Sequence, residues 1–190
     1  PLAEQGGAIV EVNAGQGLLM HLKPASGEAQ PVGRAIVDHL FAEGDEGRIP
    51  LVGITGTHGT TPVAHIVAHL LQLAGHKVGL ASSTGLSVSG RIIAIGDQAN
   101  WTGGQRLLRN RSVEAAVIEN SPAVIAGEGL SYDRCLVGIV TRIDPAFSLP
   151  AFHMESPESI WKLLRTQVDV VTDNGASVLN AHDADVLEMA

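Results

Sequence analysis

Aromatic residues are scarce in this chain of 190 residues, where they make up 3% of the sequence, and cysteine occurs only once. A single cysteine excludes an internal disulfide, and the position of Cys135 beside an apolar run indicates a buried structural thiol rather than a nucleophile. Because aromatics are so few, the core has to be aliphatic, and apolar residues make up 45% of the chain. This composition and length favour an α/β protein with one sizeable core.

Basic residues are also few, 12 against 20 acidic ones, which gives a formal net charge of −8. Lys and Arg form no cluster in the sequence, so we expect no nucleic-acid partner and no binding to an acidic membrane surface. The sequence contains neither a charged-then-apolar leader nor a long apolar span. We therefore expect a cytoplasmic protein.

The sequence is organised around an apolar strand expected at residues 51–55, a turn rich in Gly and Thr, and a helix expected at residues 63–74. The turn is placed to hold phosphate, because glycines let backbone N–H groups approach an anion at a helix N-terminus. Phosphate loops normally end in Gly-Lys-Ser/Thr, whereas Gly59 is followed here by two threonines. The turn thus lacks the lysine but keeps N–H donors, on Gly56, Thr57, Gly59 and Thr61.

The rest of the chain alternates strands and helices. The helix at 63–74 is expected to pack on the sheet through Val63, Ile66, Val67, Leu70 and Ala74. Strands are expected at 8–13, 77–81, 115–119, 136–140 and 176–180, a hairpin at 86–95 turning at Ser89-Gly90, and helices at 31–41, 102–110, 155–170 and from Asp183 onward. This alternation predicts an α/β fold with a mostly parallel sheet and a P-loop-type start, after a domain boundary between residues 22 and 50.

Several polar residues suggest chemistry but also have a plainer structural interpretation. Glu11 and Asn13, two residues apart on an expected strand, would point to one face and suit a hard cation, but an edge strand facing water explains them as well. His65 and His69, one helical turn apart, could hold zinc, but the helix pattern places them on the solvent side. Asp183 is a natural N-cap for the last helix.

The segment Ile-Pro-Leu-Val-Gly-Ile-Thr-Gly-Thr-His-Gly-Thr-Thr resembles the strand and phosphate loop of the Mur ligase superfamily, which usually ends Thr-Gly-Thr-Asn-Gly-Lys-Thr-Thr. More narrowly, the chain resembles a central piece of the cyanophycin synthetase family, ATP-dependent ligases that build an aspartate-arginine polymer. In that family an ATP-grasp domain ending Glu-Val-Asn-Ala-Gly-x-Gly is followed by a Pro-Val-Gly-x-Ala-Ile-Val-Asp helix and a Mur-ligase-like domain. Residues 10–20 and 31–57 match this order.

The resemblance implies a division of the chain into three parts. Residues 1–24 would be the C-terminal remnant of the ATP-grasp domain, 25–50 a linker with a short helix, and 51–190 a Mur-ligase-like central domain truncated at its C-terminal end. It also implies that Glu11 and Asn13 are the pair that holds magnesium on ATP in the ATP-grasp site. Without the remainder of that domain, we expect this pair to be chemically idle here.

The resemblance also assigns roles in the Mur-like part, where this sequence departs from the family. Thr60 stands where the loop lysine is expected and His58 where the asparagine is, within a degenerate nucleotide loop of Gly56, Thr57, His58, Gly59, Thr60 and Thr61. Glu119 matches the carboxylate that holds the catalytic magnesium. The family's Gly-rich turn after it is absent, the histidine expected after Asp144 is replaced, and Gln167 stands where another lysine is expected.

These substitutions favour a domain that has become structural. A lysine about 4 Å from a phosphate is worth about 4 kcal/mol at an effective dielectric constant of about 20, or roughly a thousandfold in binding. We therefore expect a scaffold or oligomerisation surface, with the rest of the ligase polypeptide and further copies as partners. Two alternatives stay open: a ligase domain that uses ATP and magnesium at Glu119, and a non-catalytic nucleotide- or anion-binding module. The parent family's cofactors are ATP and Mg²⁺, and this chain itself need bind neither.

Overall fold

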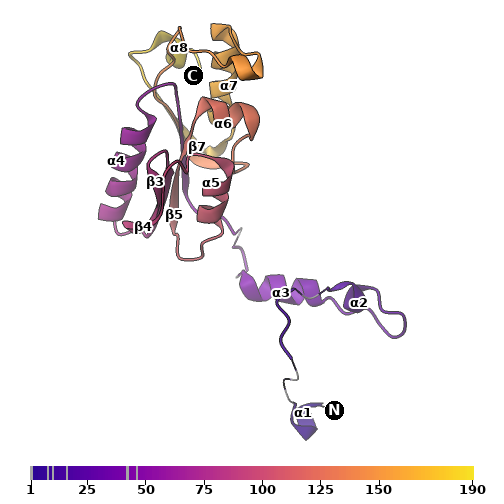
Figure 1. The fold of residues 1–190 in the computed structure, drawn as a ribbon. Coiled ribbons are helices and arrows are strands. Elements are labelled where there is room, and N and C mark those ends of the chain that lie inside the picture. Colours follow the sequence, from indigo (N-terminus) through magenta and orange to yellow (C-terminus); the bar gives the residue numbers. More distant parts are fainter. Residues whose placement is uncertain (1, 8, 10, 16, 42, 46) are drawn as a thin grey trace. The chain divides into compact units, whose positions relative to one another are not determined.

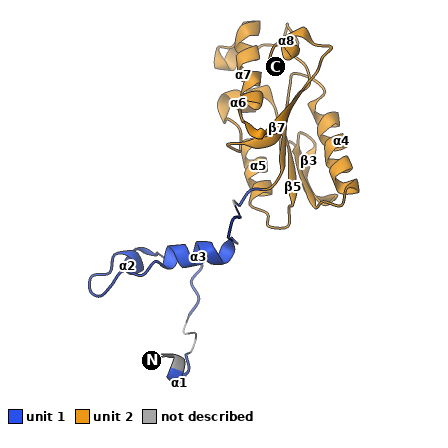
Figure 2. Ribbon diagram, turned by 180° about the vertical axis from the view of Figure 1, so that it is seen from behind, with its two compact units in different colours: residues 1–48 blue, residues 49–190 orange. Residues whose placement is uncertain are grey.

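The structure, a computed structural model, describes residues 2–7, 9, 11–15, 17–41, 43–45 and 47–190. The chain forms two compact units, Pro1–Arg48 and Ile49–Ala190 (Figure 2). None of the helices in the described part of the chain is long and apolar enough to cross a membrane.

The second unit is built on one seven-stranded sheet with the strand order β4-β3-β2-β5-β1-β6-β7. Five strands run parallel, and β3 and β4 form an antiparallel extension at one edge. The predicted mostly parallel sheet is confirmed. The strands are β1 Leu51–Thr55, β2 Val78–Ser82, β3 Gly85–Val88, β4 Arg91–Ile95, β5 Ala115–Asn120, β6 Cys135–Val140 and β7 Val171–Leu179.

Helices cover both faces of this sheet, so the unit has three layers (Figure 1). One face is covered by α4, which packs on Val52, Ile54 and the inner residues of β2. The opposite face carries α5, α6 and α7, with separate clusters around Leu107 and Leu164. The helices are α4 Thr60–Leu73, α5 Trp101–Leu108, α6 Pro122–Gly127, α7 Pro157–Asp169 and α8 Ala184–Leu187, with a 3₁₀ turn at Pro150–Phe152.

The face through which α4 packs differs from the prediction. Ala64 and Ala68 are fully buried against the sheet, flanked by Val67 and Leu71. Ile66 and Leu70 are 59% and 58% exposed, so the expectation that they face inward was wrong, as it was for Ala74. The helix carries two apolar stripes, and the one with alanines lies inside because small side chains let the helix axis approach the sheet closely.

Local turn and capping contacts explain several of the element boundaries. Ser89 and Gly90 both have left-handed φ angles, 50° and 78°, as a two-residue hairpin turn requires, so the predicted turn is confirmed. Ser121, whose side chain accepts from the backbone N–H of Val124, starts the unpredicted helix α6 with Pro122 in its first turn. The Ser156 side chain caps α7 in the same way.

The first unit contains three short helices, α1 Leu2–Gln5, α2 Leu19–Leu22 and α3 Val32–Leu40. Helix α3 confirms the prediction for residues 31–41. The strand predicted at 8–13 is not formed at Ile9 or Glu11–Asn13, because no neighbouring strand pairs with them, and Ala8 and Val10 lie outside the described residues.

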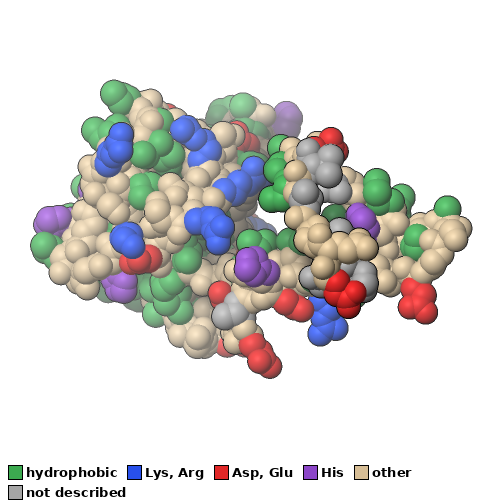
Figure 3. Space-filling model, turned by 90° about the horizontal axis from the view of Figure 1, so that it is seen from below, with side chains coloured by type: hydrophobic (Ala, Val, Ile, Leu, Met, Phe, Trp, Pro, Cys, Tyr) green, Lys and Arg blue, Asp and Glu red, His purple; other side chains and the backbone are tan. Residues whose placement is uncertain are grey.

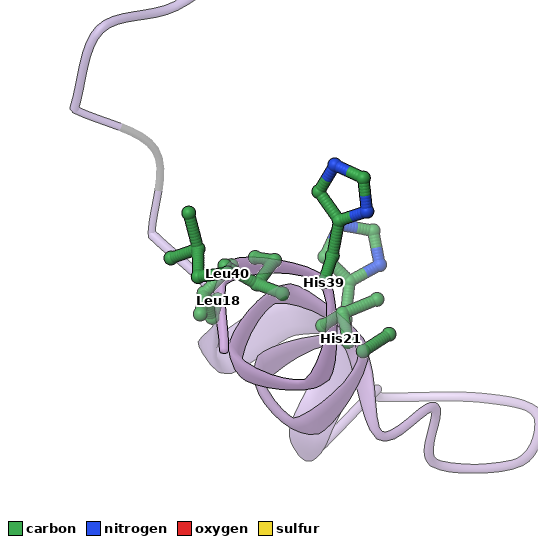
Figure 4. A pocket seen from close by; sticks show the side chains of 7 residues that line it. Leu18, His21, His39 and Leu40 are labelled. Carbon is green, nitrogen blue, oxygen red and sulfur yellow. The ribbon is translucent and has the colours of Figure 1, made fainter. Parts of the chain in front are cut away.

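A groove of about 480 Å³ lies between α2 and α3 in the first unit. It is lined by Leu18, His21, Val32, Ala35, Ile36, His39 and Leu40. Figure 4 shows the rings of His21 and His39 pointing the same way, with Leu18 and Leu40 to their left in this view. No described residue of this unit is buried, so its apolar side chains remain open to solvent.

On the face of the molecule shown in Figure 3, Lys and Arg side chains are interspersed with apolar and uncharged atoms.

Candidate functional site at the nucleotide loop

The candidate site lies where the carboxyl ends of β1 and β5 meet, at the turn between β1 and α4. Gly56 has a φ of 146°, and a Cβ there would stand 2.1 Å from the Thr141 hydroxyl oxygen, so only glycine fits. Gly59 has a left-handed φ of 80° and precedes α4, and no side chain caps this helix. The two glycines give the turn its phosphate-loop shape and leave the first N–H groups of α4 without a capping side chain.

The turn is held by the segment that follows β6. The Thr57 backbone N–H and its hydroxyl donate to the carbonyl oxygen of Arg142 at 2.8 and 3.1 Å. The Thr141 hydroxyl donates to the His58 carbonyl oxygen at 2.7 Å, and the Asp144 N–H donates to the Thr57 hydroxyl oxygen at 2.9 Å. The Thr57 N–H is therefore engaged within the protein, which corrects the prediction that it is offered to an anion.

This anchoring segment is itself tied to the end of β7. Asn180 donates from its amide to the Thr141 carbonyl oxygen at 2.8 Å. The Asp183 carboxylate accepts from the Ile143 N–H at 2.9 Å and from the Val186 N–H at 3.2 Å. Asp183 is thus the predicted N-cap of α8, and it also links this helix to the loop's support.

Glu119, at the end of β5, comes together with the two threonines that follow Gly59. Both the Thr60 and the Thr61 hydroxyls donate to its Oε1 at 2.7 Å. The backbone N–H of Ser83 donates to its Oε2 at 2.9 Å, and the side chain is only 4% exposed. The carboxylate therefore sits as an internal anion over the first turn of α4, where the helix dipole favours negative charge.

Carboxylate and hydroxyl oxygens are ligands that Mg²⁺ accepts, usually together with substrate phosphates. Both Glu119 oxygens, however, already accept hydrogen bonds from the protein's own donors. The residues that the structure describes hold no group of three or more His, Cys, Asp or Glu side chains suited to a metal ion. A cation bound to Glu119 Oε1 would compete with the hydrogen bonds from the two threonine hydroxyls, whose oxygens could then act as ligands themselves.

A second polar cluster lies on the other face of β5, directly behind Glu119. The Asn120 amide donates to the Tyr132 hydroxyl at 2.8 Å, and that hydroxyl donates to Gln167 Oε1 at 2.7 Å. Gln167, at the position where the resemblance implies a lysine, is fully buried and donates to Cys135 Sγ at 3.4 Å. Burial raises the pKa of the Tyr132 phenol and raises the pKa of the Cys135 thiol to about 11.

Sequence reasoning anticipated the buried thiol of Cys135 but not this cluster. The available signal was the pair Glu119-Asn120 at a strand end, because adjacent residues of a strand point to opposite faces. Nothing in the sequence singled out Tyr132, which lies in an irregular segment and reaches the cluster through tertiary packing.

The other sequence candidates lie outside this site. His65 and His69 are exposed on α4, and His65 Nε2 is 2.9 Å from the Thr84 hydroxyl. In the first unit, Asn13 donates from its amide to Glu11 Oε1 at 2.8 Å, so the two predicted magnesium ligands bind each other.

The fold and the loop define the second unit as a Mur-ligase-like domain. A solved UDP-N-acetylmuramoyl-L-alanyl-D-glutamate–2,6-diaminopimelate ligase matches 74% of this chain and 28% of its own at a TM-score of 0.60 and 15% identity. The Mycobacterium tuberculosis folylpolyglutamate synthase, solved with ADP and AMPPCP, matches 82% of this chain and 42% of its own at a TM-score of 0.51 and 17% identity. At such identities the likeness concerns the fold alone. No model of a protein family matches the chain.

Along the sequence the relationship is more specific. The chain is 35% identical over all 190 residues to the cyanophycin synthetase of Synechocystis, and it covers 22% of that protein. The whole chain is thus similar in sequence to one part of the cyanophycin synthetases, and 139 of its residues are 27% identical to a UDP-N-acetylmuramoylalanine–D-glutamate ligase of Synechococcus. It spans about a fifth of the length of the curated relatives it matches.

Proposed function

We propose that residues 49–190 form the Mur-ligase-like domain of a cyanophycin-synthetase-like, ATP-dependent amide ligase, and that this domain serves as a scaffold. The observation that carries the proposal is the arrangement around Glu119. Thr60 stands where the resemblance implies a lysine, and its hydroxyl donates to Glu119 at 2.7 Å. The carboxylate thus has hydrogen-bond donors from the protein itself and needs no nucleotide or cation to satisfy it.

The electrostatics of the loop support the same proposal. No positively charged side chain of the described residues forms an ion pair with Glu119, and the Arg142 side chain is exposed while its carbonyl oxygen holds Thr57. A triphosphate brought to this turn would meet a carboxylate with no lysine to offset it. Loss of one lysine contact alone corresponds to roughly a thousandfold in binding.

In this proposal the chemistry of the parent protein rests on its ATP-grasp part. That part would form an acyl phosphate on a carboxylate of the growing chain, and an amine would then displace the phosphate to form the amide. The Glu11–Asn13 pair belongs to that site by resemblance. Residues 49–190 would hold the parts of the polypeptide in place.

A second candidate rests on the retained loop geometry. Gly56 and Gly59 keep the φ angles that a phosphate loop needs, and Glu119 lies beside Thr61. In an active domain, Glu119 and Thr61 would hold Mg²⁺, whose charge would stabilise a transferring phosphoryl group. A non-catalytic nucleotide or anion sensor would need only the free N–H groups at the start of α4.

Calorimetric titration of the 190-residue chain with Mg-ATP, together with an assay for released phosphate, separates these functions. We expect no binding heat at millimolar nucleotide. Binding without phosphate release would favour the sensor, and phosphate release would overturn the scaffold.

Restoring the missing charge gives a sharper form of this test. In Thr60→Lys the new ammonium group would lie over the phosphate position, and we expect nucleotide affinity to rise by up to about a thousandfold. Thr102→Lys is the matched control, because Thr102 is exposed in the first turn of α5 and lies outside the nucleotide loop. Unchanged affinity in Thr60→Lys would contradict the idea that the turn is an inherited nucleotide loop.

A further inference from the structure

The amino edge of the seven-stranded sheet, where its parallel strands begin, brings together basic residues that are scattered along the sequence. Strands β2, β5 and β6 begin at this edge, and so does β4, because β3 runs antiparallel to both β2 and β4. Figure 3 views the molecule from below, where this edge lies, and shows Lys and Arg side chains spread over it. At or shortly before the start of these strands stand four exposed basic residues, Arg91 for β4, Lys77 for β2, Arg111 for β5 and Arg134 for β6.

The protein itself engages part of this charge. Lys77 pairs with Glu114 at 2.9 Å. The Arg134 guanidinium donates to the carbonyl oxygen of Asp169, at the end of α7, at 3.5 Å. The acidic side chains at this edge have partners as well, namely Glu114, Asp133 and Asp169. Among the described residues of this edge, no free carboxylate is left to neutralise a further basic group.

Other basic groups of the amino edge have no partner. Among the described residues, the guanidinium groups of Arg91 and Arg111 form neither an ion pair nor a hydrogen bond. Arg109 is also exposed, but it is the C-cap residue of α5, where a positive charge stabilises the helix C-terminus. Arg91 and Arg111 lie outside any helix, so this structural explanation does not extend to them.

We infer that the amino edge of the sheet is a docking surface for a short acidic peptide segment. A guanidinium group binds a carboxylate through two parallel hydrogen bonds, and uncompensated arginines on a chain of net charge −8 attract a negatively charged partner to this place. Neighbouring strands lie about 4.8 Å apart, so the row from β4 to β6 is about 24 Å long, which is the length of about seven extended residues.

The same surface suits nucleic acid less well. Single-stranded nucleic acid binds by stacking its bases on aromatic side chains, whereas aromatic residues make up 3% of this sequence and Tyr132, close to Arg134, is buried. A duplex carries one charge per about 1.7 Å and would extend past the row onto the acidic remainder of the chain. A short acidic peptide needs neither aromatic platforms nor a longer basic surface.

Fluorescence anisotropy with a labelled peptide of about ten glutamates tests this inference on the 190-residue chain. At about 20 mM salt we expect a dissociation constant on the order of 100 µM, and most of this affinity should be lost at about 300 mM salt because exposed charges are screened. Absence of binding at the lower salt concentration would overturn the inference. Equal or tighter binding of a single-stranded oligonucleotide of the same length would overturn it as well, in favour of a nucleic-acid surface.

Charge reversal locates the docking surface. Arg91→Glu and Arg111→Glu each replace an attraction by a repulsion, so each should weaken peptide binding at least about fivefold. Arg34→Glu is the matched control, because it changes the net charge by the same amount but lies on α3 in the first unit. If Arg34→Glu weakened binding as much as Arg111→Glu, net charge alone would govern binding and the amino edge would not be the docking surface.

A conservative variant tests the role of the guanidinium group. Arg111→Lys keeps the positive charge but cannot form two parallel hydrogen bonds with a carboxylate, so its affinity for the peptide should lie between those of the natural chain and Arg111→Glu. An affinity equal to that of Arg111→Glu would contradict a charge-based contact. The nucleotide loop lies at the opposite, carboxyl edge of the sheet, so the result of the Mg-ATP titration leaves these expectations unchanged and the two proposals can fail separately.

Discussion

Glu119 and Asn120 are neighbours at the end of β5, yet they serve two different polar clusters. Glu119 points to the α4 side and holds a negative charge between the hydroxyls of Thr60 and Thr61. Asn120 points to the α7 side, where it joins Tyr132 and Gln167 in a neutral and fully buried cluster. Because adjacent residues of a strand point to opposite faces, these two neighbours lie in different clusters, one at the nucleotide loop and one in the interior.

The two clusters differ in their charge. The Glu119 cluster keeps the geometry of an anion loop and lacks its cation, whereas the Asn120 cluster uses uncharged groups throughout. Gln167, standing where the resemblance implies a lysine, is compatible with this interior because an amide needs no counter-charge when it is buried. A structural role for the domain is consistent with both clusters.

The largest expected effect on stability comes from disturbing the uncharged Asn120 cluster. Gly53 lies on β1, and a Cβ there would stand 2.0 Å from the Tyr132 hydroxyl and 2.5 Å from Gln167 Nε2. Gly53→Ala should therefore disrupt the Asn120 cluster and lower the free energy of unfolding by about 3 kcal/mol or more, measured by urea denaturation.

Removing the hydroxyl that causes the clash gives the control. Tyr132→Phe in the Gly53→Ala background should recover part of the lost stability, so the two changes should be clearly non-additive. Simple additivity would mean that the cluster does not set the requirement for glycine.

A smaller effect on stability is expected from a change at Glu119. Glu119→Gln keeps the shape but replaces a carboxylate that accepts three hydrogen bonds, so the free energy of unfolding should fall by about 2 kcal/mol. Glu114→Gln, just before the same strand and exposed in a pair with Lys77, should change stability little. If Glu119→Gln raised stability, the carboxylate would be retained for function rather than for the fold.

The smallest effect concerns pH. The folded-state pKa of Cys135 is raised from an ordinary value near 9 to about 11, so folding favours the protonated thiol. Stability from this group is complete below pH 9 and is lost as the pH rises toward 11. Thermal melts of Cys135→Ala should show a shallower decline over this interval than the natural chain, and identical slopes would exclude the thiol as the cause.

The strand-loop-helix start could be predicted from sequence because strand, glycines and helix follow one another locally. The same holds for the Ser89-Gly90 turn and for Asp183, whose roles depend on neighbours within a few residues. The inner face of α4 could not be predicted, because the helix has two apolar stripes and only packing decides between them.

The candidate site was predictable only in part. Thr60 and Glu119 were recognised from the resemblance, but the contact between their side chains joins segments that are far apart in the chain. The strand expected at 8–13 is not formed at Ile9 or Glu11–Asn13. Its apolar pattern would need a neighbouring strand, which the described residues do not provide.

Asn180 and Asp183 form hydrogen bonds with Thr141 and Ile143, in the segment that supports the loop. The shape of a turn at residue 56 is therefore secured by residues more than a hundred positions later. A version of this domain shortened to end before Asn180 would keep every loop residue but lose the hydrogen bonds that hold the supporting segment. Its failure to bind a nucleotide would therefore say nothing about the 190-residue chain.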